Sequence, residues 1–245
     1  GAIALAVISW LDDLKPRSPA IRLAVQLMAV GLGVYSFSTE QPLFGDVLPR
    51  WLEFGIVGIG WLWFVNLFNF MDGIDGISSA QTIAICLGLI GIGLILEKAP
   101  VPIWYPAALC ASFAGFALWN LPPAKIFLGD IGSVTVGFLL GWLLLQLIYA
   151  GYAVSAFILP LYYLTDATIT LLRRGARGEK VWQAHREHFY QRAIQLGKSH
   201  SSISATIFTA NVGLAGLAIF AVDHPVVCLS LAAFIVGLLI HRLLR

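Results

Sequence analysis

The chain of 245 residues is dominated by apolar side chains. Hydrophobic residues make up 59% of it, charged residues only 11%, and the mean hydropathy is +0.85. Soluble domains carry roughly 25% charged residues, so this composition excludes a soluble globular protein and indicates an integral membrane protein. The formal net charge of +2 argues against a nucleic-acid partner, which needs a strongly basic surface.

The apolar segments predict an all-α polytopic membrane protein with one domain over residues 1–245. The first run, 1–11, is shorter than the roughly 20 residues that a spanning helix needs, and no basic residues precede it as in a signal peptide. We expect it to be the end of a helix that starts before this chain. Eight complete spans are expected to follow, at 20–38, 54–70, 77–96, 102–119, 133–149, 153–172, 202–222 and 225–241.

Three cysteines lie singly inside apolar runs, without the paired spacing of a metal site or an even count for disulfides. We expect them to be small core residues. They are Cys86, Cys110 and Cys228.

Successive spans place the connecting segments on alternate sides of the bilayer, so the numbers of basic residues on the two sides can be compared. Of the 15 Lys and Arg, only Arg50 and Lys98 fall on the second side, which predicts that the first side is cytoplasmic. The long segment 173–201 is then a large cytoplasmic loop. The same alternation places five acids on the cytoplasmic face: Asp12, Asp13, Asp72, Asp75 and Asp130.

Two amides and two carboxylates follow directly on an apolar run. At 100° per residue, Asn66, Asn69 and Asp72 fall on one face of a helix. Two glycines allow a turn that folds Asp75 back toward Asp72. Oxygen ligands of these types suit Mg²⁺, which also bridges to substrate phosphates. The alternative is a polar helix C-terminus that ends in an Asp-Gly turn.

The other acids are weaker signals when each is taken alone. Asp12 and Asp13 end the first apolar run, where adjacent acids are typical of solvated residues at the headgroup level. Asp130 lies at the start of the span that begins near residue 133, where it could act as an N-cap. Their common side with Asp72 and Asp75 favours a shared site, because clustered carboxylates need a metal or basic partners.

The loop 173–201 carries basic residues on the same predicted side of the membrane as these acids. His185 and His188 are three residues apart and are expected to share a helix face with Arg192, an arrangement that suits a diphosphate. Arg173 and Arg174 could instead hold anionic lipid headgroups.

Asp166 is the single acid inside a predicted span, and intramembrane acids are functional by default. Pairing with an arginine or with a backbone group is an equal alternative, so its role stays open at this point.

Four polar motifs follow one another on the predicted cytoplasmic side. They are Asp12-Asp13, Asn66-x-x-Asn69-x-x-Asp72-Gly73-Ile74-Asp75-Gly76, Phe127-Leu128-Gly129-Asp130-Ile131-Gly132-Ser133 and His185-Arg186-x-His188. In this order they resemble the polyprenyl-phosphate N-acetylhexosamine-1-phosphate transferases of glycosyltransferase family 4. That family includes the phospho-MurNAc-pentapeptide transferases, and the histidine motif here is similar to that of the O-antigen and enterobacterial-antigen branch.

The resemblance implies a many-helix membrane fold, whose first helices and Gly-rich loop would precede this chain and leave the activity of this part open. It implies Mg²⁺ or Mn²⁺ as cofactor, a UDP-N-acetylhexosamine donor and a polyprenyl phosphate acceptor such as undecaprenyl phosphate. It further implies a bacterial inner membrane with the active site on the cytoplasmic face, and it is compatible with a homodimer. The reaction would be attack of a polyprenyl phosphate oxygen on the β-phosphate of the donor, with release of UMP.

The resemblance also assigns residue roles. Asp130 matches the principal metal ligand. The catalytic set is Asp12, Asp13, Asp72 and Asp75, and the substrate-binding set is Asn66, Asn69, His185, Arg186 and His188.

The alternative function is an ion-coupled secondary transporter. Such proteins place acids near the middle of the bilayer in broken helices. Here the acids lie at predicted helix ends on one face, which argues against transport.

Overall fold

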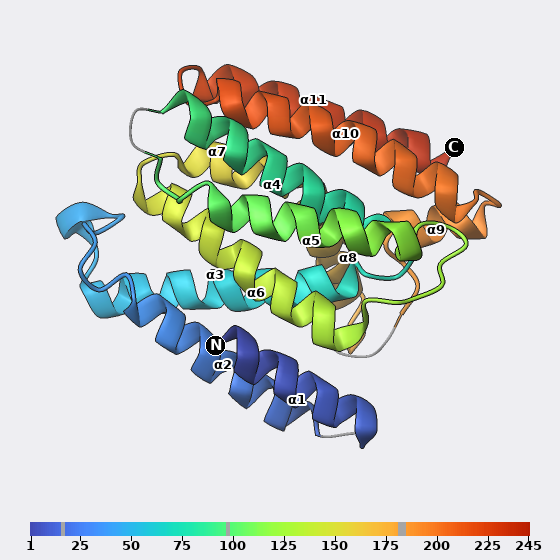
Figure 1. The fold of residues 1–245 in the computed structure, drawn as a ribbon, viewed down its shortest axis with the longest axis horizontal. Coiled ribbons are helices and arrows are strands. Elements are labelled where there is room, and N and C mark those ends of the chain that lie inside the picture. Colours follow the sequence, from blue (N-terminus) through green and yellow to red (C-terminus); the bar gives the residue numbers. More distant parts are fainter. Residues whose placement is uncertain (16–17, 97–98, 181–184) are drawn as a thin grey trace. The chain divides into compact units, whose positions relative to one another are not determined.

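The computed structural model describes residues 1–15, 18–96, 99–180 and 185–245, and within these ranges the regular structure is entirely helical (Figure 1). Lys98, and residues 181–184 of the predicted loop, lie outside the described residues. The elements are α1 (Ala2–Leu14), α2 (Pro19–Tyr35), the 3₁₀ helix η1 (Gly45–Val47), α3 (Arg50–Phe70), α4 (Ile77–Ile95), α5 (Trp104–Asn120), α6 (Gly129–Tyr149), α7 (Ala153–Ile158), α8 (Leu161–Ala176), α9 (Phe189–Gln195), α10 (His200–Phe220) and α11 (Pro225–Leu244).

The chain forms two compact units. Unit 1 consists of Gly1–Asn69 and Leu128–Ala153, and unit 2 of Phe70–Phe127 and Val154–Arg245. Unit 1 therefore holds α1, α2, α6 and all but the last residue of α3. Unit 2 holds α4, α5, all but the first residue of α7, and α8 to α11.

Among the described residues, five helices are long and apolar enough to cross a membrane: α3, α4, α6, α10 and α11. Each coincides with a predicted span, and α2 is a shorter apolar helix of 17 residues. The prediction of eight complete spans is not confirmed. The prediction of one continuous span at 153–172 is wrong, because this segment forms two helices, α7 and α8, with a break at Pro160. Proline has no N–H to continue a helix and disfavours helical backbone in the residue before it.

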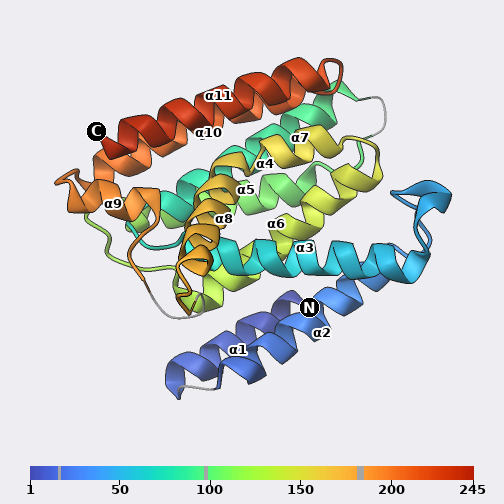
Figure 2. The same ribbon diagram turned by 180° about the vertical axis from the view of Figure 1, so that it is seen from behind.

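In unit 1, α1 packs against α2 and α6, and α1 lies beside α2 in both views of the ribbon (Figures 1 and 2). The indole of Trp61 on α3 stacks on Phe138 of α6 with ring centroids 4.6 Å apart, and its Nε1–H donates to the Phe138 carbonyl at 3.1 Å. Glycines make room for this ring. A Cβ at Gly33 would lie 2.3 Å from the indole, and one at Gly141 would lie 2.4 Å from it.

One end of unit 1 is held by a buried carboxylate on α3. Glu53 is fully buried and accepts hydrogen bonds from the Leu43 amide at 3.1 Å, from Arg50 at 2.8 Å and from the Tyr149 hydroxyl at 3.1 Å. Arg50 also donates to the Phe37 carbonyl at 2.9 Å, and the Phe37 ring stacks on Tyr149. Glu53 therefore ties the segment between α2 and α3 to the C-terminal end of α6.

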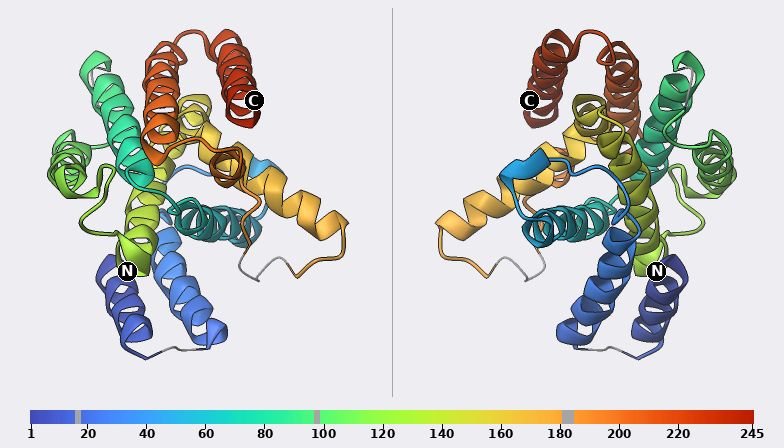
Figure 3. Two further views of the ribbon diagram at one scale, coloured as in Figure 1. Left: turned by 90° about the vertical axis from the view of Figure 1, so that its right-hand side faces the viewer. Right: turned by 90° about the vertical axis from the view of Figure 1, so that its left-hand side faces the viewer.

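In unit 2, α4 packs against both α5 and α10, and α11 packs against α8, α9 and α10. Figure 3 shows α10 and α11 as neighbours joined by a short turn. Gly88 lets α4 approach its neighbours, because a Cβ there would lie 2.2 Å from Leu159 and 3.3 Å from Ala215. A buried polar link crosses this core, in which Asn211 donates to Gln81 at 2.8 Å and Gln81 donates to the Leu159 carbonyl at 3.4 Å.

Replacing Arg50 tests the buried carboxylate of unit 1. Arg50→Ala leaves the charge of Glu53 without its ionic partner, and we expect a loss of about 3 kcal/mol in the free energy of unfolding. Tyr149→Phe removes one neutral donor and should cost about 1 kcal/mol. Unfolding in detergent micelles measures both, with Arg245→Ala at the C-terminus as the matched control. Equal stability of Arg50→Ala and the unchanged protein would contradict the assigned role.

Candidate functional site

Helix ends meet at the other end of unit 1 and bring together two acids distant in sequence. Asp12 is near the end of α1, Arg22 near the start of α2, and Asp130 is in the first turn of α6. One nitrogen of Arg22, Nη1, lies 2.8 Å from Asp12 Oδ2 and 3.2 Å from Asp130 Oδ2. The two carboxylates are therefore close enough to share one cation. Asp13 is exposed, and no hydrogen bond of its side chain joins it to this cluster within the described residues.

The two amides of α3 are fixed differently. The Ser133 hydroxyl donates to Asn69 Oδ1 at 3.1 Å and to the Gly129 carbonyl at 2.9 Å, which joins the end of α3 to the first turn of α6. Asn66 donates to Gln26 of α2 at 2.9 Å. Asn69 thus lies at the helix turn that carries Asp130, whereas Asn66 faces α2.

Asp72 and Asp75 belong to unit 2 and lie outside any helix. The prediction that Asp72 shares a helix face with Asn66 and Asn69 is wrong, because α3 ends at Phe70. The cause is a long-range contact. The Tyr190 hydroxyl donates to the Phe70 carbonyl at 3.1 Å, and a Cβ at Gly73 would lie 2.1 Å from that hydroxyl. Only glycine lets the chain pass Tyr190 so closely.

Asp72 and Asp75 both precede α4 and have different hydrogen-bond partners. Asp72 accepts from the Ser78 hydroxyl at 2.6 Å. The Asp75 carboxylate accepts from the Ala124 amide at 3.1 Å and lies 3.5 Å from His200 Nδ1. The predicted return of Asp75 toward Asp72 stays a prediction.

Asn120, at the end of α5, fixes the segment that carries Asp75. Its buried side chain accepts from the Gly76 amide at 3.1 Å and from the Ser79 hydroxyl at 3.4 Å, and donates to the Ile126 carbonyl at 3.0 Å. Gly76 has a φ of +79°, which glycine adopts without strain. Asn120 therefore joins the turn before α4 to the connection between α5 and α6.

The two predicted histidines lie side by side, with ring centroids 4.8 Å apart. They do not share a helix face, and that prediction is wrong, because α9 begins only at Phe189. The Gln191 side chain accepts a hydrogen bond from the His188 amide at 3.2 Å. This contact is typical of a capping box at the start of a helix. The pKa of His185 is lowered by its partial burial and then by neighbouring His188 and Arg174, which favours the neutral ring.

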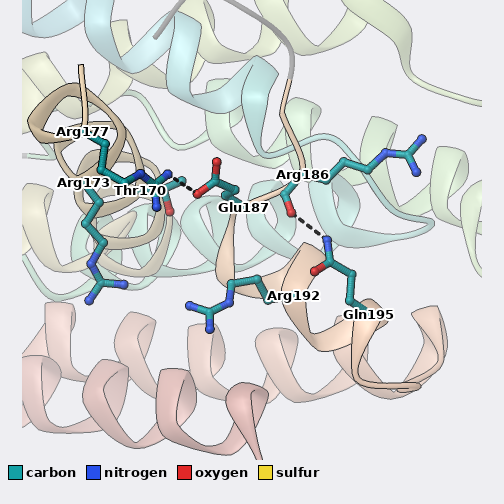
Figure 4. Close-up of a pocket in the computed structure, with 7 residues that line it drawn as sticks. All are labelled: Thr170, Arg173, Arg177, Arg186, Glu187, Arg192 and Gln195. Atoms are coloured by element: carbon teal, nitrogen blue, oxygen red, sulfur yellow. Dashed lines mark hydrogen bonds and ion pairs between the residues drawn. The ribbon is translucent and has the colours of Figure 1, made fainter. Parts of the chain in front are cut away.

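An arginine-rich cavity of about 290 Å³ lies within unit 2 (Figure 4). Its single carboxylate, Glu187, is paired with Arg177 and lies 3.5 Å from Arg174. Arg173 lies over the ring of Phe189, 5.4 Å from its centroid. In Figure 4 the Arg177 side chain points to Glu187, so the charge of that acid is already compensated. The lining residues are Thr170, Arg173, Arg177, Arg186, Glu187, Arg192 and Gln195.

The sequence prediction gave no site role to several residues of these clusters. Among them, Arg22, Asn120, Ser133 and Tyr190 each contact a predicted site residue or fix the segment that carries one. Asn120 and Ser133 had a usable signal, since an amide and a hydroxyl at helix ends are candidates for capping and for cross-links. Tyr190 had none, because its partner is the carbonyl of a residue far away in the sequence.

The chain matches the model of glycosyl transferase family 4 over residues 1–148, which include the first three of the four motifs. The chain belongs to this family. Across the described residues, no group of three or more His, Cys, Asp or Glu is placed to hold a metal ion.

Curated relatives carry related names. The chain is 27% identical over 210 residues to a Bacillus subtilis protein named "Probable undecaprenyl-phosphate N-acetylglucosaminyl 1-phosphate transferase", covering 82% of this chain and 58% of that protein. It is 28% identical over 219 residues to the undecaprenyl-phosphate alpha-N-acetylglucosaminyl 1-phosphate transferase of Thermotoga maritima, covering 88% and 68%. It is 32% identical over 155 residues to the phospho-N-acetylmuramoyl-pentapeptide-transferase of Synechococcus elongatus, covering 55% and 42%. The chain thus spans about half the length of most of these relatives.

Replacing Asn120 tests the anchor of the segment that carries Asp75. Asn120→Leu leaves the Gly76 amide and the Ile126 carbonyl without their partner, and we expect a loss of about 2 kcal/mol in the free energy of unfolding. Ser79→Ala removes only the longest of the three hydrogen bonds and should cost less than half as much. Thermal unfolding in detergent micelles compares the two variants, and an equal cost would contradict the role of Asn120.

Proposed function

We propose that the protein transfers an N-acetylhexosamine 1-phosphate from a UDP-sugar to polyprenyl phosphate and releases UMP. The observation that carries the proposal is the family 4 match over residues 1–148. The names of the Bacillus and Thermotoga relatives support the lipid and the sugar class. Five helices are long and apolar enough to cross a membrane, which supports a multi-pass membrane enzyme. Its proposed place is the bacterial inner membrane, with the active site on the cytoplasmic face.

The sugar is expected to be an N-acetylhexosamine, and the first step of a cell-envelope polysaccharide is the proposed role. Relatives named for N-acetylglucosamine transfer and for phospho-N-acetylmuramoyl-pentapeptide transfer both match this chain. The O-antigen branch therefore stays a prediction that a panel of donors decides.

Asp130 and Asp12 are the proposed Mg²⁺ or Mn²⁺ ligands. Both carboxylates contact the same nitrogen of Arg22, and this shared contact supports a cation site between them. Two carboxylates suit Mg²⁺, which commonly takes one or two protein carboxylates and completes its shell with water and substrate phosphate oxygens. The ion would supply positive charge to the diphosphate and to the leaving UMP.

The basic segment of unit 2 is proposed to hold the phosphates of the donor. Arg186 and the two histidines were predicted for this role, and the arginine-rich cavity adds Arg173 and Arg192. Planar guanidinium groups bind phosphate oxygens in pairs. Because Arg177 and Arg174 already neutralise Glu187, the cavity has a net excess of positive charge for an anion.

The remaining acids are proposed to orient substrates. Asp75 is held by a backbone amide and Asp72 by Ser78, so both carboxylates have defined positions on the proposed nucleotide side. Asp13 is proposed to act with Asp12 on the acceptor. A general base is not required, because a phosphate with a second pKa near 6 is mostly dianionic at pH 7.

UMP release tests the proposed reaction. The purified membrane protein in nanodiscs is given undecaprenyl phosphate and a panel of UDP-sugars, with and without Mg²⁺. Asp130→Asn should lower the rate by at least about 100-fold, because it removes a charged ligand of the ion. Asp223→Asn makes the same change in the exposed turn between α10 and α11 and should leave the rate unchanged. Absence of metal-dependent UMP with every donor would overturn the proposal, and exchange of labelled substrate across the bilayer of sealed proteoliposomes would support transport instead.

Divalent-cation affinity tests the proposed ligands without turnover. Arg22→Gln removes the positive charge that Asp12 and Asp130 share, so we expect Mn²⁺ to bind about tenfold more tightly. Electron paramagnetic resonance of Mn²⁺ titrations measures the affinity. Adding Asp130→Asn to Arg22→Gln should abolish the gain. Unchanged or weaker Mn²⁺ binding in Arg22→Gln would place the ion elsewhere.

A further inference from the structure

Asp166 on α8 is a fully buried carboxylate with an unusually complete set of hydrogen-bond donors, all within unit 2. Two donors come from one turn away on the same helix, and three come from the segment that begins with the second predicted histidine. They are the Tyr162 hydroxyl at 3.0 Å, the Thr170 hydroxyl at 3.3 Å, His188 Nδ1 at 3.1 Å, the Phe189 amide at 3.0 Å and the Tyr190 amide at 3.4 Å.

The backbone contacts give Asp166 a structural role. The Phe189 and Tyr190 amides are the first two of α9 and have no acceptor within their own helix. A carboxylate at a helix N-terminus satisfies such donors. Asp166 thereby anchors the start of α9 on α8. Of the partners considered from the sequence, an arginine or a backbone group, the structure shows backbone groups.

The histidine contact goes beyond what a helix anchor needs. A carboxylate surrounded by four other donors can only accept a hydrogen bond from the ring, so Nδ1 of His188 must carry a proton. In the neutral ring this leaves Nε2 as the nitrogen with a free lone pair, and in the charged ring Nε2 is a donor. No described residue bonds to Nε2. The histidine ring also stacks against Tyr190, which limits its rotation.

We propose that Asp166 is a positioning residue for the transfer reaction, which acts by holding the ring of His188 in one orientation and in the Nδ1–H form. Nε2 is then the ring nitrogen left for the donor substrate, and it can donate to a phosphate oxygen when the ring carries both protons. The inference rests on the proposed function, in which His188 binds the donor phosphates. The same anchor sets the position of Arg192 and Gln195 on α9, which line the arginine-rich cavity.

A spectroscopic experiment tests the orientation without any turnover. Protein labelled with ¹⁵N-histidine is reconstituted in nanodiscs, and the His188 signals are assigned with His188→Gln. In the unchanged protein, the chemical shift of Nδ1 should be that of a protonated nitrogen in both the neutral and the charged ring. In Asp166→Asn the two tautomers should mix, because an amide can donate to the ring as well as accept from it. A neutral His188 that carries its proton on Nε2 in the unchanged protein would overturn the inference.

A kinetic cycle tests whether Asp166 acts through His188. Asp166→Asn should lower kcat for UMP release about 100-fold, because a misplaced group loses its alignment with the reacting phosphate. In a His188→Gln background the same substitution should have no further effect. Tyr162→Phe is the matched control, since it removes one donor from the same carboxylate without touching His188, and its kcat should change less than about threefold. If the double variant instead loses kcat by the product of the two single effects, Asp166 acts independently of His188 and has a structural role only.

The two readouts separate failure of the inference from failure of the proposed function. If the unchanged protein releases no UMP, the transferase proposal fails while the tautomer in the ¹⁵N spectrum still decides the Asp166 contact. If Asp166→Asn does not fold, as judged by thermal unfolding, the spectrum of the unchanged protein decides the question alone. If UMP is released but Asp166→Asn has normal kcat, the positioning role is overturned.

Discussion

Buried polar side chains in a membrane protein cannot form hydrogen bonds with water, so each must find its partners inside the protein. That constraint shapes both units of this chain. Glu53 is fully buried and has three kinds of donor: a backbone amide, an arginine and a tyrosine. Asp166 is fully buried and has five donors. In each case the partners come from other elements as well as the same helix, so the carboxylate fixes how elements of its own unit pack. Glu53 orders the end of unit 1 away from the acid pair, and Asp166 orders the basic segment of unit 2.

The chemistry-bearing residues collect where helices begin and end. Asp12, Asn69 and Asp130 lie in the last or first turn of three helices of unit 1, and the N-terminus of α2 supplies Arg22 as a shared counter-charge. In unit 2, the turn before α4 and the segment before α9 carry the remaining motifs. Helix ends are suitable places for such groups, because their unpaired amides and carbonyls require polar partners. The chain also passes between the units at residues 69–70 and 127–128, so two of the four motifs contain a crossing point.

The two units carry different kinds of charged cluster. Unit 1 holds a carboxylate pair with the Arg22 guanidinium between them, and unit 2 holds a cavity whose one acid is already neutralised. Carboxylates suit a divalent cation and guanidinium groups suit phosphate oxygens. The family match includes the acids of unit 1 and those before α4, whereas the basic segment lies beyond residue 148.

The sequence by itself determined the membrane class, the helices with long apolar runs, the order of the four motifs and the family. These follow from composition and from local spacing, which one stretch of chain carries alone. Tertiary structure decided what depends on distant partners. Asp72 does not share the helix face of Asn66 and Asn69, because α3 ends at Phe70, whose carbonyl accepts from the Tyr190 hydroxyl, 120 residues away. The histidines were placed on a helix that starts only after them, since its N-terminus is fixed by Asp166 on α8. The role of Asp166 could not be read from spacing, because a carboxylate and the groups that bind it meet only when α8 and α9 are packed.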